Sequence, residues 1–428
     1  MNVSPRCRWI VSLVVGAGMA VQASSLQAQE TLREFTAGES PDHPMRDCNT
    51  TPNRSGVPAA GWNFVWENDT AVPDAPTDEE YTQGLQFGYR FRPDQQPRWL
   101  GRPMGWICRG ISAASDEDHR DLYGAGSVFI GQHLFTPGDG DARGLIPDDR
   151  PYAAWLYLGT RLEVAQPFEG KFARSGLFHS FELQVGTLGP RAKGEWVQNE
   201  FHSLIGSDPL LGWNNQLSDE WGVQAFYKVR ALAGKWSGSR IEADVTVTSE
   251  VGLGTVQILA GTGGVFRVGR NLGDPVADTL GPRVLESTRD VEGARAAPAQ
   301  RECLGGRGIF AIKECYAYVG VNGRATAFNA FLDGGMFEGG HRVDREPFTY
   351  DLLWGARLRW SRFQLDYTAV TSSREFSPVP AQTQSRDGKH RFGAVNVRCF
   401  APVDENMRRW DLVCPGFFTV LLGLVAAQ

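Results

Sequence analysis

Segments in which apolar and polar residues alternate recur along most of this chain, and they limit the folds that it can adopt. In one of them Leu352, Trp354 and Leu358 share a side. Arg357 and Arg359 fall on the opposite side. A repeat of two is that of a β-strand, whose successive side chains point to opposite faces of a sheet. The pattern therefore predicts an all-β protein.

Twelve segments carry this pattern, and most are about ten residues long, as in strands that cross a membrane at a tilt. They are residues 62–68, 82–91, 124–134, 153–164, 177–188, 223–232, 240–251, 255–268, 314–325, 349–361, 363–371 and 391–400. The alternative is a soluble β-sandwich, and with it a secreted soluble enzyme, although such strands are long for a sandwich. Cell fractionation distinguishes the two.

No internal segment is an uncharged apolar stretch of about 18 residues, the length that a membrane-spanning helix needs. A membrane role would then require a closed β-barrel, because helices and closed barrels alone satisfy every backbone hydrogen bond in lipid. The 50 glycines and a mean hydropathy below zero fit an outer-membrane barrel with a polar lumen. The net charge of −6 argues against a nucleic-acid partner.

The N-terminal residues are typical of a cleaved export signal. Arg6 and Arg8 precede an apolar run over residues 9–21, and Ala23 or Ala28 could end the signal. The expected division of the chain is therefore a signal peptide at 1–28, a polar lead at 29–60, a barrel at 61–400 and a tail of unassigned role at 401–428.

Six cysteines remain once Cys7 leaves with the signal, and an even number in an exported protein permits disulfides. Cys303 and Cys315 are close enough in sequence to close a loop. No cysteine spacing is typical of a zinc site, so a structural role is expected for all six.

Residues 194–206 break the strand pattern and predict a short helix. Val197 and Phe201 fall on an apolar face, whereas Gln198 and His202 fall one turn apart on a polar face. A helix that holds one imidazole rigidly would suit acid–base chemistry. A surface helix with a solvated histidine is the alternative.

Two long connections interrupt the strands. One is the helix-bearing stretch 189–222, and the other is a polar, Pro- and Gly-rich loop over residues 270–308. Long connections on one side of the barrel and tight turns such as 360–362 on the other are the usual asymmetry of outer-membrane barrels.

Polar groups gather at several strand ends. Asn68 and Asp69 close the first segment, Thr82 opens the second, and Asp208 follows His202 closely. Their hard oxygen atoms suit Ca²⁺, although Asn-Asp at a strand end is more commonly a turn. The sequence has no Gly-x-Ser-x-Gly, His-Glu-x-x-His or P-loop motif, which disfavours serine hydrolases, zinc proteases and nucleotide-binding proteins.

Together these segments resemble the outer-membrane lipid A 3′-O-deacylase family. The matching stretches are Glu67-Asn68-Asp69, Tyr81-Thr82-Gln83-Gly84-Leu85, Asp149-Arg150-Pro151-Tyr152-Ala153-Ala154, and residues 186–202 and 212–217. The resemblance spans residues 61–400. It implies a twelve-stranded antiparallel transmembrane β-barrel with a short helix in a connection on the extracellular side.

The resemblance also implies the chemistry. His202 would activate water against an ester carbonyl, with Gln198, Asn68 and Thr82 as further catalytic residues. Asp69 would bind Ca²⁺, which would stabilise the oxyanion. The expected substrate is lipid A of lipopolysaccharide, among the lipids of the bacterial outer membrane, and the protein is expected to be a monomer.

Three residues are assigned to substrate binding by the same resemblance: Arg143, Arg150 and Asp208. Asp208 stands where a relative has Glu, and Ala142-Arg143 stands where that relative has two basic residues for the lipid A phosphates. A solvated loop arginine is the alternative for Arg143. A non-catalytic barrel, either a pore or a structural protein, is the competing function, since a pore needs no histidine on a helix.

Overall fold

The computed structural model describes residues 60–72, 80–91, 96–115, 122–166, 177–272, 303, 311–360, 363–377 and 389–400. The predicted signal peptide at 1–28, the lead up to residue 59, most of the 270–308 loop and the tail at 401–428 lie outside these residues.

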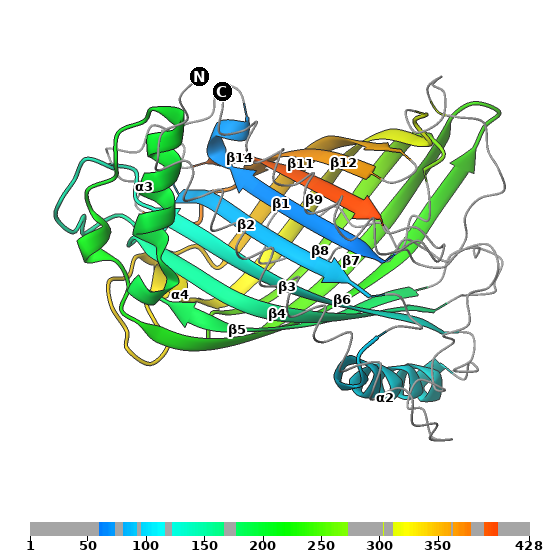
Figure 1. Cartoon of the computed structure of the whole chain (residues 1–428), viewed down its shortest axis with the longest axis horizontal. Helices are drawn as coiled ribbons and strands as arrows, with labels where there is room; N and C mark the ends of the chain where they lie inside the picture. The colour runs from blue at the N-terminus through cyan, green and yellow to red at the C-terminus, as the bar shows by residue number, and fades with distance from the viewer. Residues whose placement is uncertain are drawn as a thin grey trace, which may run out of the picture.

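Twelve antiparallel strands close into a barrel, in the order β1-β14-β12-β11-β9-β8-β7-β6-β5-β4-β3-β2 (Figure 1). The strands are β1 (Gly61–Asn68), β2 (Glu80–Arg90), β3 (Tyr123–Thr136), β4 (Ala153–Gln166), β5 (Leu177–Leu188), β6 (Glu220–Ser237), β7 (Glu242–Gly254), β8 (Gln257–Arg270), β9 (Glu314–Asn329), β11 (Phe348–Arg359), β12 (Phe363–Ser372) and β14 (His390–Phe400). Each of the twelve predicted segments corresponds to one of these strands, so the predicted fold class is confirmed.

The alternation of each strand separates an outer wall from a lumen. On β11, Leu352 and Trp354 are 50% and 57% exposed, whereas Arg357 is 2% exposed and faces Asp366 of β12 in register. The outer wall is apolar elsewhere too, as at Leu158 of β4, which is 66% exposed. An apolar outer wall over buried ion pairs is the arrangement of a barrel that sits in lipid.

Side chains fill the lumen. Its aromatic part includes Trp155 and Tyr157, and Phe331 of α4 (Ala330–Asp333) stacks on Phe135 at 4.1 Å between ring centroids. Buried ion pairs join neighbouring strands between β4 and β12: Arg161–Glu182, Lys228–Glu250, Arg267–Asp244, Arg324–Asp351 and Arg357–Asp366. The described interior is therefore not that of an open channel, which disfavours the pore interpretation.

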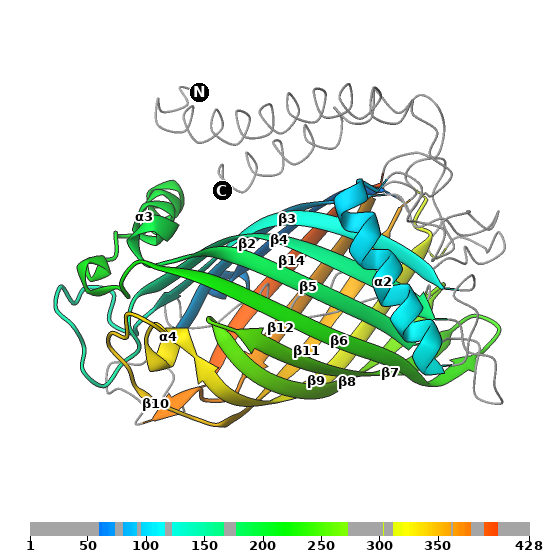
Figure 2. The ribbon, with the colours of Figure 1, turned by 90° about the horizontal axis from the view of Figure 1, so that it is seen from below.

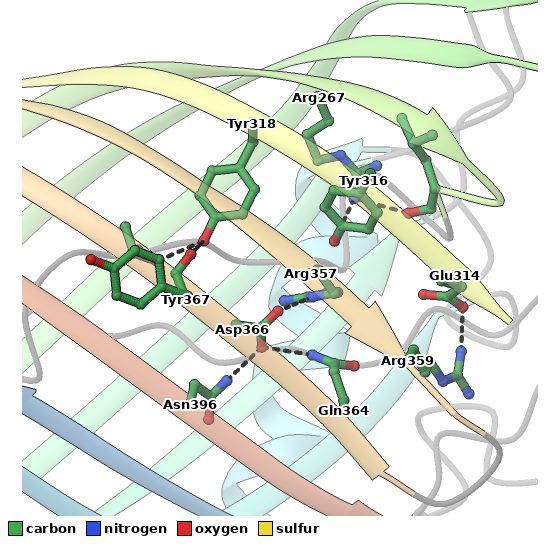
Figure 3. A network of polar contacts seen from close by, with 12 residues as sticks. Arg267, Glu314, Tyr316, Tyr318, Arg357, Arg359, Gln364, Asp366, Tyr367 and Asn396 are labelled. Atoms are coloured by element: carbon green, nitrogen blue, oxygen red, sulfur yellow. Dashed lines mark hydrogen bonds and ion pairs between the residues drawn. The ribbon is translucent and has the colours of Figure 1, made fainter. Parts of the chain in front are cut away.

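Asp366 is the centre of one such cluster (Figure 3). Besides its ion pair with Arg357, it accepts hydrogen bonds from Gln364 and Asn396, each at 2.9 Å. The buried carboxylate is thus held by donors from three neighbouring strands, as a charge in a low-dielectric lumen requires.

The helices lie at opposite ends of the barrel. α3 (Gly194–Ile205) and α4 lie at the end where β1 finishes, whereas α2 (Arg98–Ser115) joins β2 to β3 at the other end (Figure 1). β10 (Asp344–Arg345) lies at the α3 end (Figure 2), where it pairs with β13 (Phe376–Ser377) in a two-stranded ladder. No helix among the described residues is long and apolar enough to cross a membrane.

The expected asymmetry of long and short connections is wrong in one respect. β8 ends and β9 begins at the α2 end, so the connection 271–313 lies on the same side as the tight turn 360–362 and not beside α3. Each strand crosses the barrel once, so successive connections alternate between its two ends, whatever the length or composition of the connection. The expected proximity of Cys303 and Cys315 is confirmed, since they form a disulfide that closes part of this connection.

Candidate functional site

α3 packs on the outside of the barrel wall. Its Val197 joins a cluster with Leu134 of β3 and Ala154 of β4, both on the lipid-facing side of their strands. The short helix η5 (Pro190–Ala192) leads into α3, and the carbonyl of Ala192 accepts a hydrogen bond from Gln132 of β3 at 2.6 Å. The connection between β5 and β6 is thereby folded back over the wall, and this positions the helix.

Gly194 allows the first turn of α3 to approach the wall closely. A Cβ at this position would lie 2.7 Å from the Cβ of Ala154 and 2.6 Å from the ring of Trp213. Trp213 begins the short helix η6 (Trp213–Asn215) and is 1% exposed. A side chain larger than hydrogen would therefore lift the helix from the wall.

Gln198 and His202 lie on the packed side of α3. They are 0% and 2% exposed, whereas Trp196 is 47% exposed. The predicted helix is confirmed, and its polar face is covered as well as the apolar face of Val197, which packs on the wall. A solvated surface histidine, the alternative interpretation, does not fit this burial.

The hydrogen bonds of His202 define its tautomer. Its Nδ1 lies within hydrogen-bond distance of the Asp208 carbonyl oxygen, which can only accept, so Nδ1 carries the proton. Nε2 then has a lone pair, and Gln198 Nε2 donates to it at 2.8 Å. A neutral imidazole with an oriented, unprotonated nitrogen is the form that a general base requires.

The polar residues at the end of β1 form the second half of the candidate site. Asn68 is 1% exposed, and its amide donates to the Thr82 carbonyl at 3.1 Å. The ladder between β2 and β3 shifts register at Thr82, whose hydroxyl lies 2.5 Å from that of Thr136. Asp69 begins the short helix η2 (Asp69–Ala71), is 0% exposed and accepts a hydrogen bond from the Thr70 amide at 2.8 Å.

One aromatic contact joins the two halves. Trp66 shares the outer face of β1 with Asn68, since the two are separated by one residue, and its ring lies 6.3 Å from that of Phe201. Phe201 precedes His202 on α3. The structure therefore brings the β1–β2 end and the histidine helix together on the outer side of the barrel, at one end.

The three expected substrate-binding residues lie in different surroundings. Arg143 is exposed on the β3–β4 connection, where its carbonyl accepts a hydrogen bond from Asn215 at 2.8 Å. Asp208 is exposed, and the group that meets His202 is its backbone carbonyl. Arg150 is 1% exposed and pairs with Glu375 at 2.7 Å.

Arg150 belongs to the mouth of the lumen and not to the contact of α3 with the outer wall. Its guanidinium lies 5.2 Å from the ring centroid of Phe135, a lumen residue. The adjacent Asp149 accepts from the amides of Gly138 and Arg150, yet burial still raises the pKa of its carboxyl above the ordinary value. These contacts fold the β3–β4 connection.

Two contributions to the candidate site had no signal in the sequence. The Asp208 carbonyl is a main-chain group, so its residue type does not reveal it. Thr136 contacts Thr82 because β2 and β3 are neighbours with a register shift, and a pattern within one strand cannot show such a pair.

Oxygen atoms that suit a hard cation lie at the β1 end. Asp69 supplies a buried carboxylate, and Asn68 and Thr82 supply amide, hydroxyl or carbonyl oxygens, which are the ligand types that Ca²⁺ prefers. Among the described residues no three His, Cys, Asp or Glu side chains gather as a metal site. Oxygen donors of this kind suit a hard cation, whereas zinc prefers nitrogen and sulfur ligands.

The fold and the site together define an outer-membrane β-barrel protein with a candidate acid–base site on its outer wall. The family model described as outer membrane protein LpxR matches residues 19–399, and the chain belongs to this family. This confirms the resemblance drawn from the motifs.

A solved structure supports the fold. LpxR from Salmonella typhimurium is similar with a TM-score of 0.56 and 17% identity, over 79% of this chain and 99% of that chain. The β domain of the Bordetella autotransporter BrkA has a TM-score of 0.34 and 10% identity, over 81% of this chain and 99% of that chain. A comparison with curated proteins found no match.

Proposed function

We propose that this protein is a carboxylic ester hydrolase that removes the 3′-linked acyl, or acyloxyacyl, chain of lipid A in the outer leaflet of the outer membrane. Family membership supports the substrate class. The observation that carries the proposal is His202: it is buried against the lipid-facing wall with Nδ1 held by a carbonyl and Nε2 unprotonated. A base on the lipid-facing wall would be accessible to an ester group of a lipid in the membrane.

The reaction follows from this tautomer. His202 Nε2 takes a proton from water while the water oxygen bonds to the ester carbonyl carbon. The bond between the carbonyl carbon and the 3′ oxygen of the sugar then breaks, and the imidazolium returns the proton to that departing oxygen. The products are a free acid and a 3′-hydroxyl group. Gln198 donates to Nε2 here, and in the proposed reaction its amide would hold the attacking water once that water replaces the contact.

Asp69, with Asn68 and Thr82, would hold Ca²⁺ beside the reacting carbonyl. The bound ion would supply electrostatic stabilisation of the oxyanion. Arg143, exposed at the same end, would meet an anionic phosphate of lipid A. Arg150 and the Asp208 side chain are given no substrate contact, because the first is ion-paired in the mouth and the second acts through its carbonyl.

Mass spectrometry of lipid A tests the proposal. Cells that carry the wild-type protein should release the 3′-linked chain, with loss of that mass from lipid A, whereas cells with His202→Ala should not. Unchanged lipid A in cells with a folded wild-type barrel would overturn the proposal, and the competing non-catalytic barrel would then stand.

The same proposal includes export. Residues 1–28 would be removed as a signal peptide, and the mature chain would be recovered from the outer membrane in detergent. Recovery of the mature chain in the soluble periplasmic fraction would contradict the membrane location.

A further inference from the structure

The helix α2 lies on the outside of the barrel, at the end opposite α3 (Figure 2). Its buried side chains Leu100 and Met104 pack on Leu162 and Val164 of β4. Both β4 residues occupy outward-facing positions, like Leu158 farther along the same strand, which α2 leaves 66% exposed. The helix therefore covers the last part of the lipid-facing wall and borders the part that stays bare.

Local contacts hold α2 against the strands. Gln96, just before the helix, donates to the Gly124 carbonyl at 3.1 Å. A Cβ at Gly126 would lie 2.8 Å from Gln96 Oε1 and 3.3 Å from Leu100, so glycine permits the close approach. Cys108 is buried and disulfide-bonded. The helix is thus a fixed element on the wall and not a loosely attached segment.

The exposed side of α2 combines aromatic and basic side chains. Trp99 and Trp106 are 56% and 67% exposed. Arg98, Arg102 and Arg109 are exposed as well, and the helix contains no acidic residue. In a helix the positions 102, 106 and 109 lie on one face, so the basic and aromatic groups alternate along a single stripe.

We propose that α2 is an interfacial helix that lies along the headgroups of acidic phospholipids in the leaflet at its end of the barrel. Tryptophan is enriched where hydrocarbon meets headgroups, and arginine attracts anionic lipid. The exposed side of α2 adjoins the exposed apolar wall of the barrel, so the stripe lies where the hydrocarbon meets the headgroups. The identity of this leaflet as the inner one rests on the proposed function, which places α3 at the outer leaflet.

The depth of a nitroxide label on α2 tests this proposal. The label is attached through Ala113→Cys, an exposed position on the stripe that leaves both tryptophans and all three arginines in place. The full mature chain is reconstituted in vesicles of phosphatidylcholine with phosphatidylglycerol, and folding is checked by heat-modifiable gel mobility. The control label is Asp141→Cys, an exposed position on the β3–β4 connection at the other end.

The measured quantities are the collision rates of the label with two reagents. Oxygen partitions into lipid, whereas a nickel chelate stays in water. The Ala113 label should lie about 5–10 Å inside the headgroup boundary, and the Asp141 label should be open to the chelate. Equal access of the chelate to both labels would overturn the proposal. A label shielded from both reagents would also overturn it, because protein and not lipid would then cover α2.

The charge of α2 is tested separately. In vesicles of phosphatidylcholine alone, the Ala113 label should move outward relative to vesicles with phosphatidylglycerol. The combined variant Arg98→Gln, Arg102→Gln, Arg109→Gln should abolish this difference, and Arg102→Gln alone should reduce it if the combined variant does not fold. A lipid-dependent depth that survives these changes would refute recognition of acidic lipid. None of these readouts uses deacylation, so their failure is distinct from failure of the proposed function.

Discussion

His202 differs from a surface histidine because the protein engages both of its ring nitrogens. The Asp208 carbonyl holds Nδ1, and the Gln198 amide lies at Nε2. The ring is therefore oriented before substrate arrives, which reduces the reorganisation that proton transfer requires.

The first prediction is that His202→Ala lowers the rate of deacylation by about 10²–10⁴-fold, because a positioned general base contributes that much. The rate is measured by mass spectrometry of lipid A with purified protein. His179→Ala is the matched control: His179 is also buried and lies within hydrogen-bond distance of Tyr227, but it lies near the α2 end. A folded His202→Ala protein with wild-type turnover would refute the assignment.

The second prediction concerns the cation. Excess EGTA should stop the reaction and Ca²⁺ should restore it, whereas Zn²⁺ should not, because it prefers nitrogen and sulfur ligands. Asp69→Asn keeps the shape of the side chain but removes its charge, so it should lower the Ca²⁺ affinity and the rate together. Asp141→Asn, an exposed position at the same end, serves as the control. Full activity of the wild type in EGTA would contradict the role of the metal.

At the scale of the element, α3 owes its position to its fit against the wall. Gly194 allows the helix to lie close to Ala154 and Trp213, and the ring of Phe201 contacts that of Trp66. The helix thereby joins residues contributed by β1 with those contributed by the β5–β6 connection. In the proposed mechanism, the distance of the helix from the wall would be a condition for the chemistry.

The third prediction is that Gly194→Ala lowers the rate, on the order of 10²-fold for a displacement near 1 Å, although alanine favours helix. The barrel should stay folded, since the strands are unchanged. Gly144→Ala is the control, because a Cβ there would meet nothing within 4 Å. Equal rates for the two variants would show that the distance between helix and wall does not matter.

Another connection at the α3 end is held by a carboxylate. Glu220, the first residue of β6, accepts hydrogen bonds from the amides of Met336, Phe337 and Glu338, each at 3.1 Å. Three amide donors around one carboxylate are a compact way to hold a turn at the mouth of the lumen. The end of the barrel that carries the candidate site is thus built from fixed connections.

At the scale of the whole molecule, the candidate site is separated from the lumen. The candidate site lies on the outer wall, and paired charges and aromatic rings fill the interior. The interior should therefore affect the stability of the barrel but not the activity.

The fourth prediction tests this separation. Asp366→Leu leaves Arg357 without its carboxylate in the lumen, and breaking a buried pair costs about 3–5 kcal/mol. The temperature of the heat-modifiable gel shift should fall, while the rate of the protein that stays folded should not change. The double variant Asp366→Leu, Arg357→Leu should recover part of the loss. An unchanged transition in the single variant would contradict a stabilising role for this pair.

The sequence alone predicted the strands and their two faces, because the repeat of two is a local property of extended backbone. Leu352 and Arg357 were assigned to opposite sides of the barrel for this reason, and the helix over 194–205 followed from its own local pattern. The family resemblance was likewise a matter of short motifs. Local patterns of this kind do not need the rest of the chain.

Only the tertiary structure decided which segments that are distant in sequence contact one another. The face of α3 that carries Gln198 and His202 is buried because the helix docks on the outer wall, and no periodicity within the helix shows which surface covers it. The side on which 271–313 emerges depends on the count of strands, and the Asp208 carbonyl reaches His202 through the turn after α3. The helix α2 was missed although Leu100, Met104 and Ile111 repeat at helical spacing, because Pro103 and the glycines beside it disfavour a helix. The surface that its apolar side covers is decided by where β4 lies.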